Sequence, residues 1–197
     1  MEIVIASTSV HAIREIRAML KALRRFDIFT LHDFPQCVHT AASGDTFEQM
    51  ASSQALLTAK ALNKVVIADA SGLVVPALQG LPGLASQHYA GALASDKENR
   101  DKLLHDMKGL IDVHRQAYLE CCLAVATPLG INKCVKGVSE GIILDHERGR
   151  YGYAYDSIFL KHDYSKTFAE LDEDTKNRIS HRRKAFDKLI LTLEALS

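Results

Sequence analysis

Basic residues gather near the C-terminal end of the chain, in the stretch Lys176-Asn-Arg-Ile-Ser-His-Arg-Arg-Lys184. Ser180 is a favourable N-cap residue, and apolar side chains recur at helical spacing behind it, which predicts a helix from about His181. Cations at the start of a helix oppose its dipole, which favours anions there by about 0.3–1 kcal/mol each. The stretch therefore predicts a site for phosphate or another anion, and the plain alternative is a solvated basic turn.

Two further stretches carry residue types suited to chemistry. Val65-Val-Ile-Ala-Asp69 is an apolar run that ends in a carboxylate and precedes Ser71-Gly72. Ligands of open α/β sheets bind at the carboxyl ends of strands, so Asp69 is a candidate functional acid; otherwise it bonds to the next turn. The glycine–tyrosine loop at residues 149–155 offers Tyr153 and Tyr155 either as a stacking platform or as loop packing.

The elements that must hold these residues alternate between strand and helix. Apolar runs predict strands at residues 2–6, 26–31, 65–69, 115–127, 133–144 and 156–160. Helical periodicity predicts helices at residues 10–23, 46–62, 96–107 and 172–177, and one from 181 to the end. The turn at Pro128-Leu-Gly130 predicts a hairpin between the strands at 115–127 and 133–144, which argues against an all-parallel sheet. We expect a single α/β domain over residues 1–197, with a mixed central sheet flanked by helices.

Composition narrows the partners and the compartment. The 197 residues are 47% hydrophobic and 24% charged with zero formal net charge, so nucleic acid and membrane surfaces are not expected partners. No apolar run is long enough to span a bilayer, and the N-terminus lacks the basic region of a signal peptide. The four cysteines have no disulfide or zinc spacing and predict reduced thiols in the cytoplasm: Cys37, Cys121, Cys122 and Cys134.

Short motifs also follow one another in a fixed order along almost the whole chain. They are Ile5-Ala-Ser-Thr-Ser9, Ala68-Asp-Ala-Ser-Gly-Leu73, Gly80-Leu-Pro-Gly83, Gly152-Tyr-Ala-Tyr-Asp-Ser-Ile-Phe159 and Lys176-Asn-Arg-Ile-Ser-His-Arg182. In this order they resemble the inosine-triphosphate pyrophosphatase family, enzymes that hydrolyse non-canonical purine nucleoside triphosphates such as ITP, dITP and XTP.

The resemblance implies an elongated mixed α/β fold with two lobes around a nucleotide cleft, usually in a homodimer. It also implies Mg²⁺, a metal-bound water that attacks the α-phosphorus, and release of monophosphate and pyrophosphate in nucleotide-pool sanitation. His181 and Arg182 match residues that reach the 6-keto base, and Tyr153 matches a stacking phenylalanine. The substrate-binding positions it implies are Ser7, Thr8, Ser9, Ser71, Tyr153, Ala154, Tyr155, Asp156, Lys176, His181 and Arg182.

Positions for the metal and the triphosphate depart from the family pattern. Ser9 and Ala12 replace an asparagine and a lysine, Gln49, Met50 and Gln54 replace a glutamate, an asparagine and a lysine, and Ala70 replaces the second aspartate of D-D-S-G. Magnesium prefers carboxylate oxygens, and loss of a general base typically costs about 10²–10⁴-fold in rate. Asp69 remains as the candidate catalytic acid, and Glu48 is a weak candidate for a displaced metal site with it.

Three interpretations stay open at this point. The chain is an active pyrophosphatase that uses Asp69, with Glu48 or Asp156, in an altered metal shell. Alternatively, it is a nucleotide-binding protein of impaired activity, or a variant altered at Ala70 and elsewhere to stop turnover. Two smaller expectations accompany these: Arg14 and Glu15 form a surface pair, and His11 faces the phosphates in place of the missing lysine.

Overall fold

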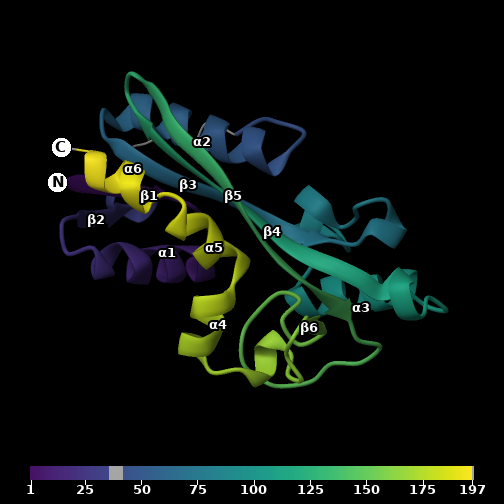
Figure 1. Cartoon of the computed structure of the whole chain (residues 1–197). Helices are drawn as coiled ribbons and strands as arrows, with labels where there is room; N and C mark the ends of the chain where they lie inside the picture. The colour runs from purple at the N-terminus through teal and green to yellow at the C-terminus, as the bar shows by residue number, and fades with distance from the viewer. Residues whose placement is uncertain (36–41, 197) are drawn as a thin grey trace. The chain divides into compact units, whose positions relative to one another are not determined.

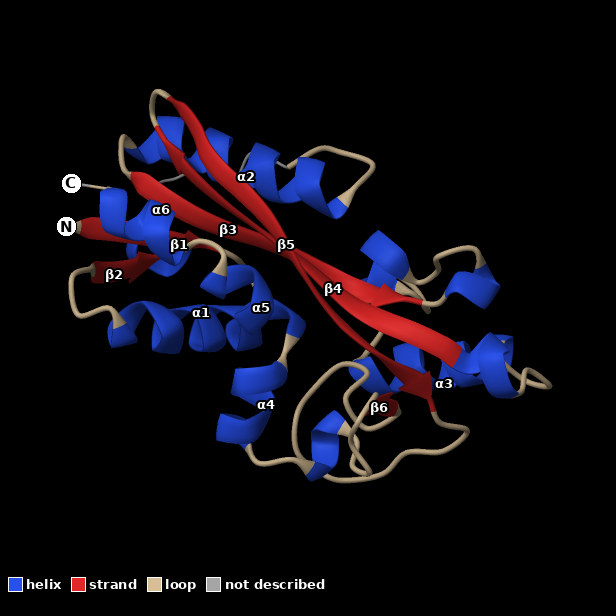
Figure 2. Ribbon diagram, in the orientation of Figure 1, coloured by secondary structure: helices blue, strands red, loops and turns tan. Residues whose placement is uncertain are grey.

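A six-stranded mixed sheet organises the chain in the computed structural model, which describes residues 1–35 and 42–196. Its strand order is β2-β1-β3-β4-β5-β6, with β1 parallel to β2 and β3, and β5 antiparallel to β6 (Figures 1 and 2). The strands are β1 (Glu2–Ala6), β2 (Asp27–Thr30), β3 (Val65–Val74), β4 (Gln116–Thr127), β5 (Gly130–Ile143) and β6 (Phe159–Lys161). The predicted mixed α/β class is confirmed.

Helices begin where the sequence supplies capping side chains. They are α1 (Val10–Ala22), α2 (Phe47–Leu62), α3 (Asp96–Asp106), α4 (Glu173–Ile179), α5 (His181–Asp187) and α6 (Ile190–Ala195). The N-cap residues of α1, α2 and α3 are Ser9, Thr46 and Ser95. The side chain of each accepts a hydrogen bond from a backbone N–H in the first turn of its helix. A capping box between Ser95 and Glu98 fixes the start of α3 on both sides.

The chain divides into two compact units, and the first comprises Met1–Ser71, Cys121–Gly137 and His181–Ser197. Its main core joins α1, α5 and α6 to one face of the strands, with Ile5, Ile16, Ile67 and Phe186 among the buried residues. Side chains alternate across a strand, so Val66 and Ala68 face the other way, where α2 lies (Figure 2). The α2 residues Ala51, Ala55 and Ala59 are fully buried, and their small size allows close approach of the helix.

The second unit comprises Gly72–Glu120 and Val138–Ser180 and has its own core. Leu73, Leu103, Phe159 and Phe168 are fully buried there, and the Phe159 and Phe168 rings meet edge to face at 5.2 Å. The strands β3, β4 and β5 each run from one unit into the other. The expectation of a single domain over residues 1–197 stays a prediction.

Several predicted boundaries were wrong, among them the start of β5, which begins at Gly130 and not at residue 133. Strand β3 continues past Asp69 to Val74, because a second apolar run after Gly72 is buried as well. Residues 156–158 form tight turns, with the Ile158 N–H bonded to the Tyr155 carbonyl, so only Phe159–Lys161 forms a strand. The C-terminal helix is broken into α5 and α6, because Lys188 and Leu189 bond to carbonyls three residues back.

Cysteine and membrane features can be compared with the expectations. Cys121 and Cys122 are buried and Cys134 is half-buried, and all three are free thiols; Cys37 lies outside the described residues. Burial raises the pKa of the Cys121 thiol well above its ordinary value. Within residues 1–35 and 42–196, no helix has the length and apolar content needed to cross a membrane.

Candidate functional site

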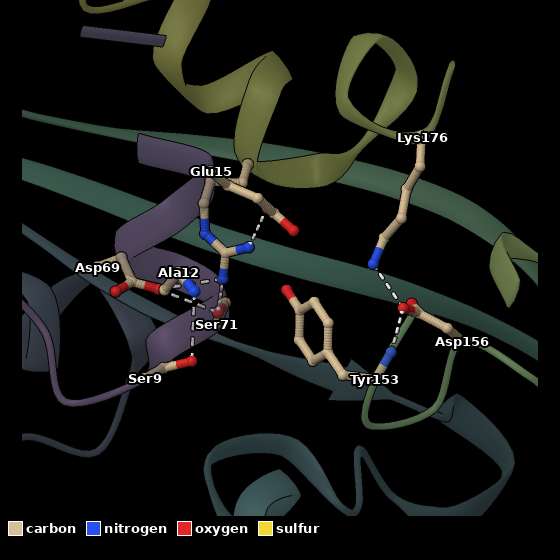
Figure 3. A network of polar contacts seen from close by, with 9 residues as sticks. Ser9, Ala12, Glu15, Asp69, Ser71, Tyr153, Asp156 and Lys176 are labelled. Carbon is tan, nitrogen blue, oxygen red and sulfur yellow. Dashed lines mark hydrogen bonds and ion pairs between the residues drawn. The ribbon is translucent and has the colours of Figure 1, made fainter. Parts of the chain in front are cut away.

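Arg182 is the centre of a buried polar cluster in the first unit. Its guanidinium contacts the Glu15 carboxylate through Nη1, and its Nη2 lies 3.2 Å from Oδ2 of Asp69 and 2.8 Å from Oγ of Ser71 (Figure 3). The Ser71 hydroxyl also donates to Asp69 over 3.2 Å. Exposed fractions of the Arg182, Glu15 and Asp69 side chains are 3%, 8% and 6%. Three of the predicted residues therefore meet: Asp69, Ser71 and Arg182.

Glu15 was wrongly expected to form a surface pair with Arg14. The Glu15 side chain belongs to the buried stripe of α1, beside Ala12, Ile16 and Met19, whereas Arg14 is exposed. The missed signal was an acidic residue at a core position of an amphipathic helix, which requires a buried cation nearby. Glu15 is thus a member of this cluster that the sequence analysis had placed on the surface.

The start of α5 is held close to β5. A Cβ atom at Gly137 would lie 2.2 Å from the His181 carbonyl oxygen and 2.3 Å from the Ala185 nitrogen, so only glycine allows this approach. His181 and Arg182 are buried in consequence, and the alternative of a solvated basic turn is wrong for both. The anions that Arg182 contacts are carboxylates of the protein itself.

Asp69 and Glu48 do not form one site. Asp69 alternates with Ala68 and Ala70 along β3, so its side chain faces α1 and α5, while Glu48 is exposed in the first turn of α2 on the opposite face. Gln49, at the family glutamate position, instead accepts a hydrogen bond from the Asp45 N–H over 2.8 Å, just before the N-cap residue Thr46 of α2.

The described side chains consequently do not fit a divalent cation. Asp69 already accepts from Arg182 and Ser71, and Ala70 offers no oxygen on the α2 face of β3. Across the part of the chain that the structure describes, no three His, Cys, Asp or Glu side chains come together as a metal site. A hard cation such as Mg²⁺ needs oxygen ligands, and the carboxylates that the family provides for it are replaced here.

The loop before α1 caps its own helix. Ser9 Oγ accepts from the Ala12 N–H over 3.3 Å, and Ser7 Oγ accepts from the Ser9 N–H over 3.3 Å. Thr8 and His11 are exposed, and Ala12 is fully buried where the family pattern has lysine. The hydroxyls of Ser7 and Ser9 thus already have backbone partners within the loop.

The second unit contains a separate cluster around Asp156. The Lys176 Nζ lies 2.5 Å from Oδ2 of Asp156 and 4.2 Å from the centre of the Tyr153 ring (Figure 3). The Tyr153 N–H also donates to Oδ2 of Asp156 over 2.8 Å. Gly152 lies so close to the Asp156 carboxylate that a Cβ atom there would be 2.3 Å from Oδ2. An ammonium group over a ring face is a favourable cation–π arrangement, and it brings Tyr153, Asp156 and Lys176 together.

Tyr155 is more deeply buried than Tyr153 and Ala154, which are both partly exposed. Tyr155 is buried in the core of the second unit, and its hydroxyl donates to the Ser86 carbonyl over 2.8 Å. Burial raises the pKa of Tyr155 well above its ordinary value. Loop packing is therefore the interpretation that fits Tyr155, whereas the partly exposed Tyr153 keeps the stacking interpretation open.

Known proteins resemble the chain over its whole length. The dITP/XTP pyrophosphatase of Protochlamydia amoebophila is 52% identical over 197 residues, which cover 100% of this chain and 99% of that protein. The dITP/XTP pyrophosphatase of Chlamydia abortus is 48% identical, covering 100% and 96%. The structure of the Staphylococcus aureus Ham1 protein has a TM-score of 0.88 at 36% identity, covering 100% of both chains.

A second solved structure agrees. The HAM1 protein from Coxiella burnetii superposes with a TM-score of 0.89 at 33% identity over 98% of each chain. The resemblance to the inosine-triphosphate pyrophosphatase family is confirmed by these relatives and by a family pattern that matches residues 3–192, and the chain belongs to the Ham1 family.

Proposed function

We propose that this chain binds non-canonical purine nucleoside triphosphates, such as ITP, dITP and XTP, and hydrolyses them to the monophosphate and pyrophosphate. The observation that carries the proposal is the cluster of Tyr153, Asp156 and Lys176 in the second unit. Its residues match positions of the family's nucleotide contacts, with tyrosine in place of phenylalanine at position 153, in a chain that is 52% identical to a dITP/XTP pyrophosphatase over its full length.

Recognition of the nucleotide rests on this cluster and on the start of α5. Tyr153 provides a partly exposed ring for stacking of a base. Lys176 provides a cation whose position is fixed by Asp156. His181 and Arg182 provide donors for a 6-keto oxygen, and the same donors would meet the amino group of adenine unfavourably, which gives a preference for inosine and xanthosine nucleotides. The remaining proposed contacts are Ser7, Thr8, Ser9 and Ser71.

Hydrolysis requires a group that takes a proton from the attacking water. Water adds to the α-phosphorus, the bond to the bridging oxygen of pyrophosphate breaks, and the proton of the water passes to a base. Asp69 is the proposed base. Because it already accepts hydrogen bonds from Arg182 and Ser71, it has fewer lone pairs available for the water, and we expect slow turnover.

A second candidate function is nucleotide binding with little or no turnover. Specific observations favour it: the Gln49 side chain bonds to the backbone of Asp45, Ala12 is fully buried in the core, and Ala70 carries no carboxylate. These changes remove anionic ligands and phosphate-binding cations while the Tyr153 cluster remains. The two candidates share the substrate class and differ only in rate.

Pyrophosphate release separates the two candidates. The chain is incubated with ITP and XTP across a magnesium titration, with ATP and GTP as controls, and ITP affinity is measured by calorimetry alongside. Tyr153→Ala should weaken ITP binding by about 1–3 kcal/mol through lost stacking, whereas the matched variant Tyr153→Phe keeps the ring and should bind nearly as well.

Each result has a defined meaning. Slow pyrophosphate release from ITP and XTP supports the enzyme, and tight ITP binding without release supports the second candidate. ITP affinity that is unchanged in Tyr153→Ala, or equal affinity for ATP, would overturn the proposed recognition. We also expect a homodimer, which light scattering during size-exclusion chromatography would measure directly.

A further inference from the structure

The backbone of Ala154, which lies between Tyr153 and Tyr155, is hydrogen-bonded at its N–H and at its carbonyl to side chains of α3. Ala154 has φ +49°, a left-handed conformation that residues with a Cβ rarely adopt. Its N–H donates to Oδ2 of Asp96 over 2.8 Å, and its carbonyl accepts from Nη1 of Arg100 over 2.7 Å. Both polar groups of this unusual residue therefore meet charged side chains.

Asp96 and Arg100 are four residues apart on α3, so they share one face of that helix. The Ser95–Glu98 capping box fixes the turn that carries Asp96. Arg100 is held in addition by Glu147, whose Oε2 lies 3.2 Å from its Nε and accepts from the Ser157 hydroxyl over 2.9 Å. The loop is thus connected to α3 at two places. Ala154 bonds directly to Asp96 and Arg100, and Ser157 bonds to Glu147, which contacts Arg100.

Packing alone does not hold this loop. A cavity of about 150 Å³ lies beside it, lined among others by Arg100, Glu147, Tyr153 and Ala154. Ala154 packs against the core of the second unit, and the hydrogen bond from the Asp156 N–H to the Tyr153 carbonyl closes a turn around it. The cavity leaves the other side of the loop without packing contacts, so the bonds from Asp96 and Arg100 are additional restraints on the left-handed conformation. The same conformation sets the direction of the neighbouring Tyr153 ring.

We infer that Asp96 and Arg100 are positioning residues for nucleotide recognition. They fix the peptide of Ala154 and thereby aim the Tyr153 ring and the Asp156 carboxylate, without contacting the base themselves. The inference rests on the proposed function for its ligand, but the restraint on the loop is a property of the unliganded chain. Nothing in the sequence marks Asp96 and Arg100 apart from the other charges on α3.

Helix α3 supplies its own matched control. Lys97 and Asp101 form an exposed ion pair with the same spacing of four residues, and their side chains are 69% and 53% exposed. The variants Asp96→Ala and Arg100→Ala are compared with Lys97→Ala and Asp101→Ala. Amide hydrogen exchange of residues 149–157 is followed in the unliganded chain, ITP affinity by calorimetry, and Tm by differential scanning calorimetry.

We expect faster exchange at residues 149–157 and about tenfold weaker ITP binding in Asp96→Ala and Arg100→Ala, because a small misplacement of a binding group is costly. Asp96→Asn keeps an acceptor oxygen for the Ala154 N–H and should recover most of both losses. The Lys97 and Asp101 variants should show neither loss. A uniform fall in Tm without selective exchange at the loop is not the expected pattern.

Three results would overturn the inference. Unchanged exchange at residues 149–157 in both variants would show that α3 does not restrain the loop. Faster exchange with unchanged ITP affinity would show a structural tie with no part in recognition. If the unsubstituted chain binds no ITP, the proposed function fails and the positioning role falls with it, while the exchange data still report whether the restraint exists.

Discussion

The two compact units differ in how far they keep the residues of their family. All of the departures at metal and triphosphate positions fall in the first unit: Ser9, Ala12, Gln49, Met50, Gln54 and Ala70. In the second unit, Tyr155, Asp156 and Lys176 match the family pattern, whereas tyrosine replaces phenylalanine at position 153 and alanine replaces glycine at position 154. The departures at metal and triphosphate positions are therefore confined to the first unit, which also carries the proposed contacts at the start of α5.

The charged clusters of the two units also differ in how many carboxylates surround the cation. In the first, Arg182 is shared by the carboxylates of Glu15 and Asp69, so the remaining acid is engaged within the protein. In the second, one carboxylate, Asp156, holds one ammonium group, Lys176, over an aromatic ring. If the proposed function holds, the loop proposed to stack on the base is retained while the positions proposed for catalysis have changed.

The largest expected effect comes from restoring the missing acid in the first unit. Position 70 faces α2, on the side of β3 opposite to Asp69, so a carboxylate there would not be engaged by Arg182. Ala70→Asp should raise pyrophosphate release from ITP by about 10²–10⁴-fold, which is the usual contribution of a general base. Adding Gln49→Glu on α2 should increase the magnesium dependence further.

A control variant and a binding measurement test this prediction. Ser71→Asp places a new acid one residue later, on the Asp69 side of the strand, and should give no such gain. Equal ITP affinity before and after the repair would show that the second unit was intact throughout. If Ala70→Asp and the double variant bind ITP but release no more pyrophosphate than the original chain, the first unit is not simply lacking a base.

An intermediate effect should distinguish the two charged clusters by stability. Asp156→Asn removes the carboxylate that Lys176 contacts, and loss of one member of a buried ion pair costs about 3–5 kcal/mol of unfolding free energy. Glu15→Gln should cost less, about 1–3 kcal/mol, because Arg182 keeps its contact with Asp69. Guanidinium unfolding followed by circular dichroism measures both values.

Arg14→Ala provides the control for this comparison, since Arg14 is exposed and adjacent to Glu15. It should change the unfolding free energy by no more than about 0.5 kcal/mol. A loss for Glu15→Gln as small as that for Arg14→Ala would mean that Glu15 behaves as the surface residue first expected. A loss larger than that of Asp156→Asn would reverse the order of the two clusters.

Local patterns predicted much of the fold. The apolar run of β1, the stripe of α1 and the N-cap residues Ser9 and Thr46 each specify their element without help from distant residues. The hairpin of β4 and β5 followed in the same way from two apolar runs around a turn at Pro128. The contact of Arg182 with Asp69 and Ser71 did not follow from local patterns, and only the family resemblance of the ordered motifs suggested a shared site.

Long-range partners could not be predicted in this way. Glu15 and Arg182 are 167 residues apart, and whether a charge is buried depends on what another element places opposite it. The end of β3 was missed because Ser71-Gly72 resembles a turn, although the buried residues Leu73 and Val74 continue the strand. The close approach of α5 to Gly137 likewise follows from tertiary packing, which overrides local preference.

The smallest expected effect concerns α4, which carries Lys176, and it depends on pH. Asp172 caps this helix, and hydrogen bonds from the backbone and the side chain of Thr175 hold the pKa of its carboxyl below the ordinary 3.8. Because the folded pKa is the lower one, the cap stabilises the fold above pH 3.8, and the effect is lost as the pH falls through the folded pKa. Unfolding of Asp172→Asn should therefore show a small deficit at pH 6 that disappears near pH 2. Asp174→Asn should show a smaller deficit, because Asp174 lies in the same first turn and interacts with the helix dipole but is not the N-cap residue. A deficit of equal size at both pH values would mean that the charge of Asp172 does not stabilise α4.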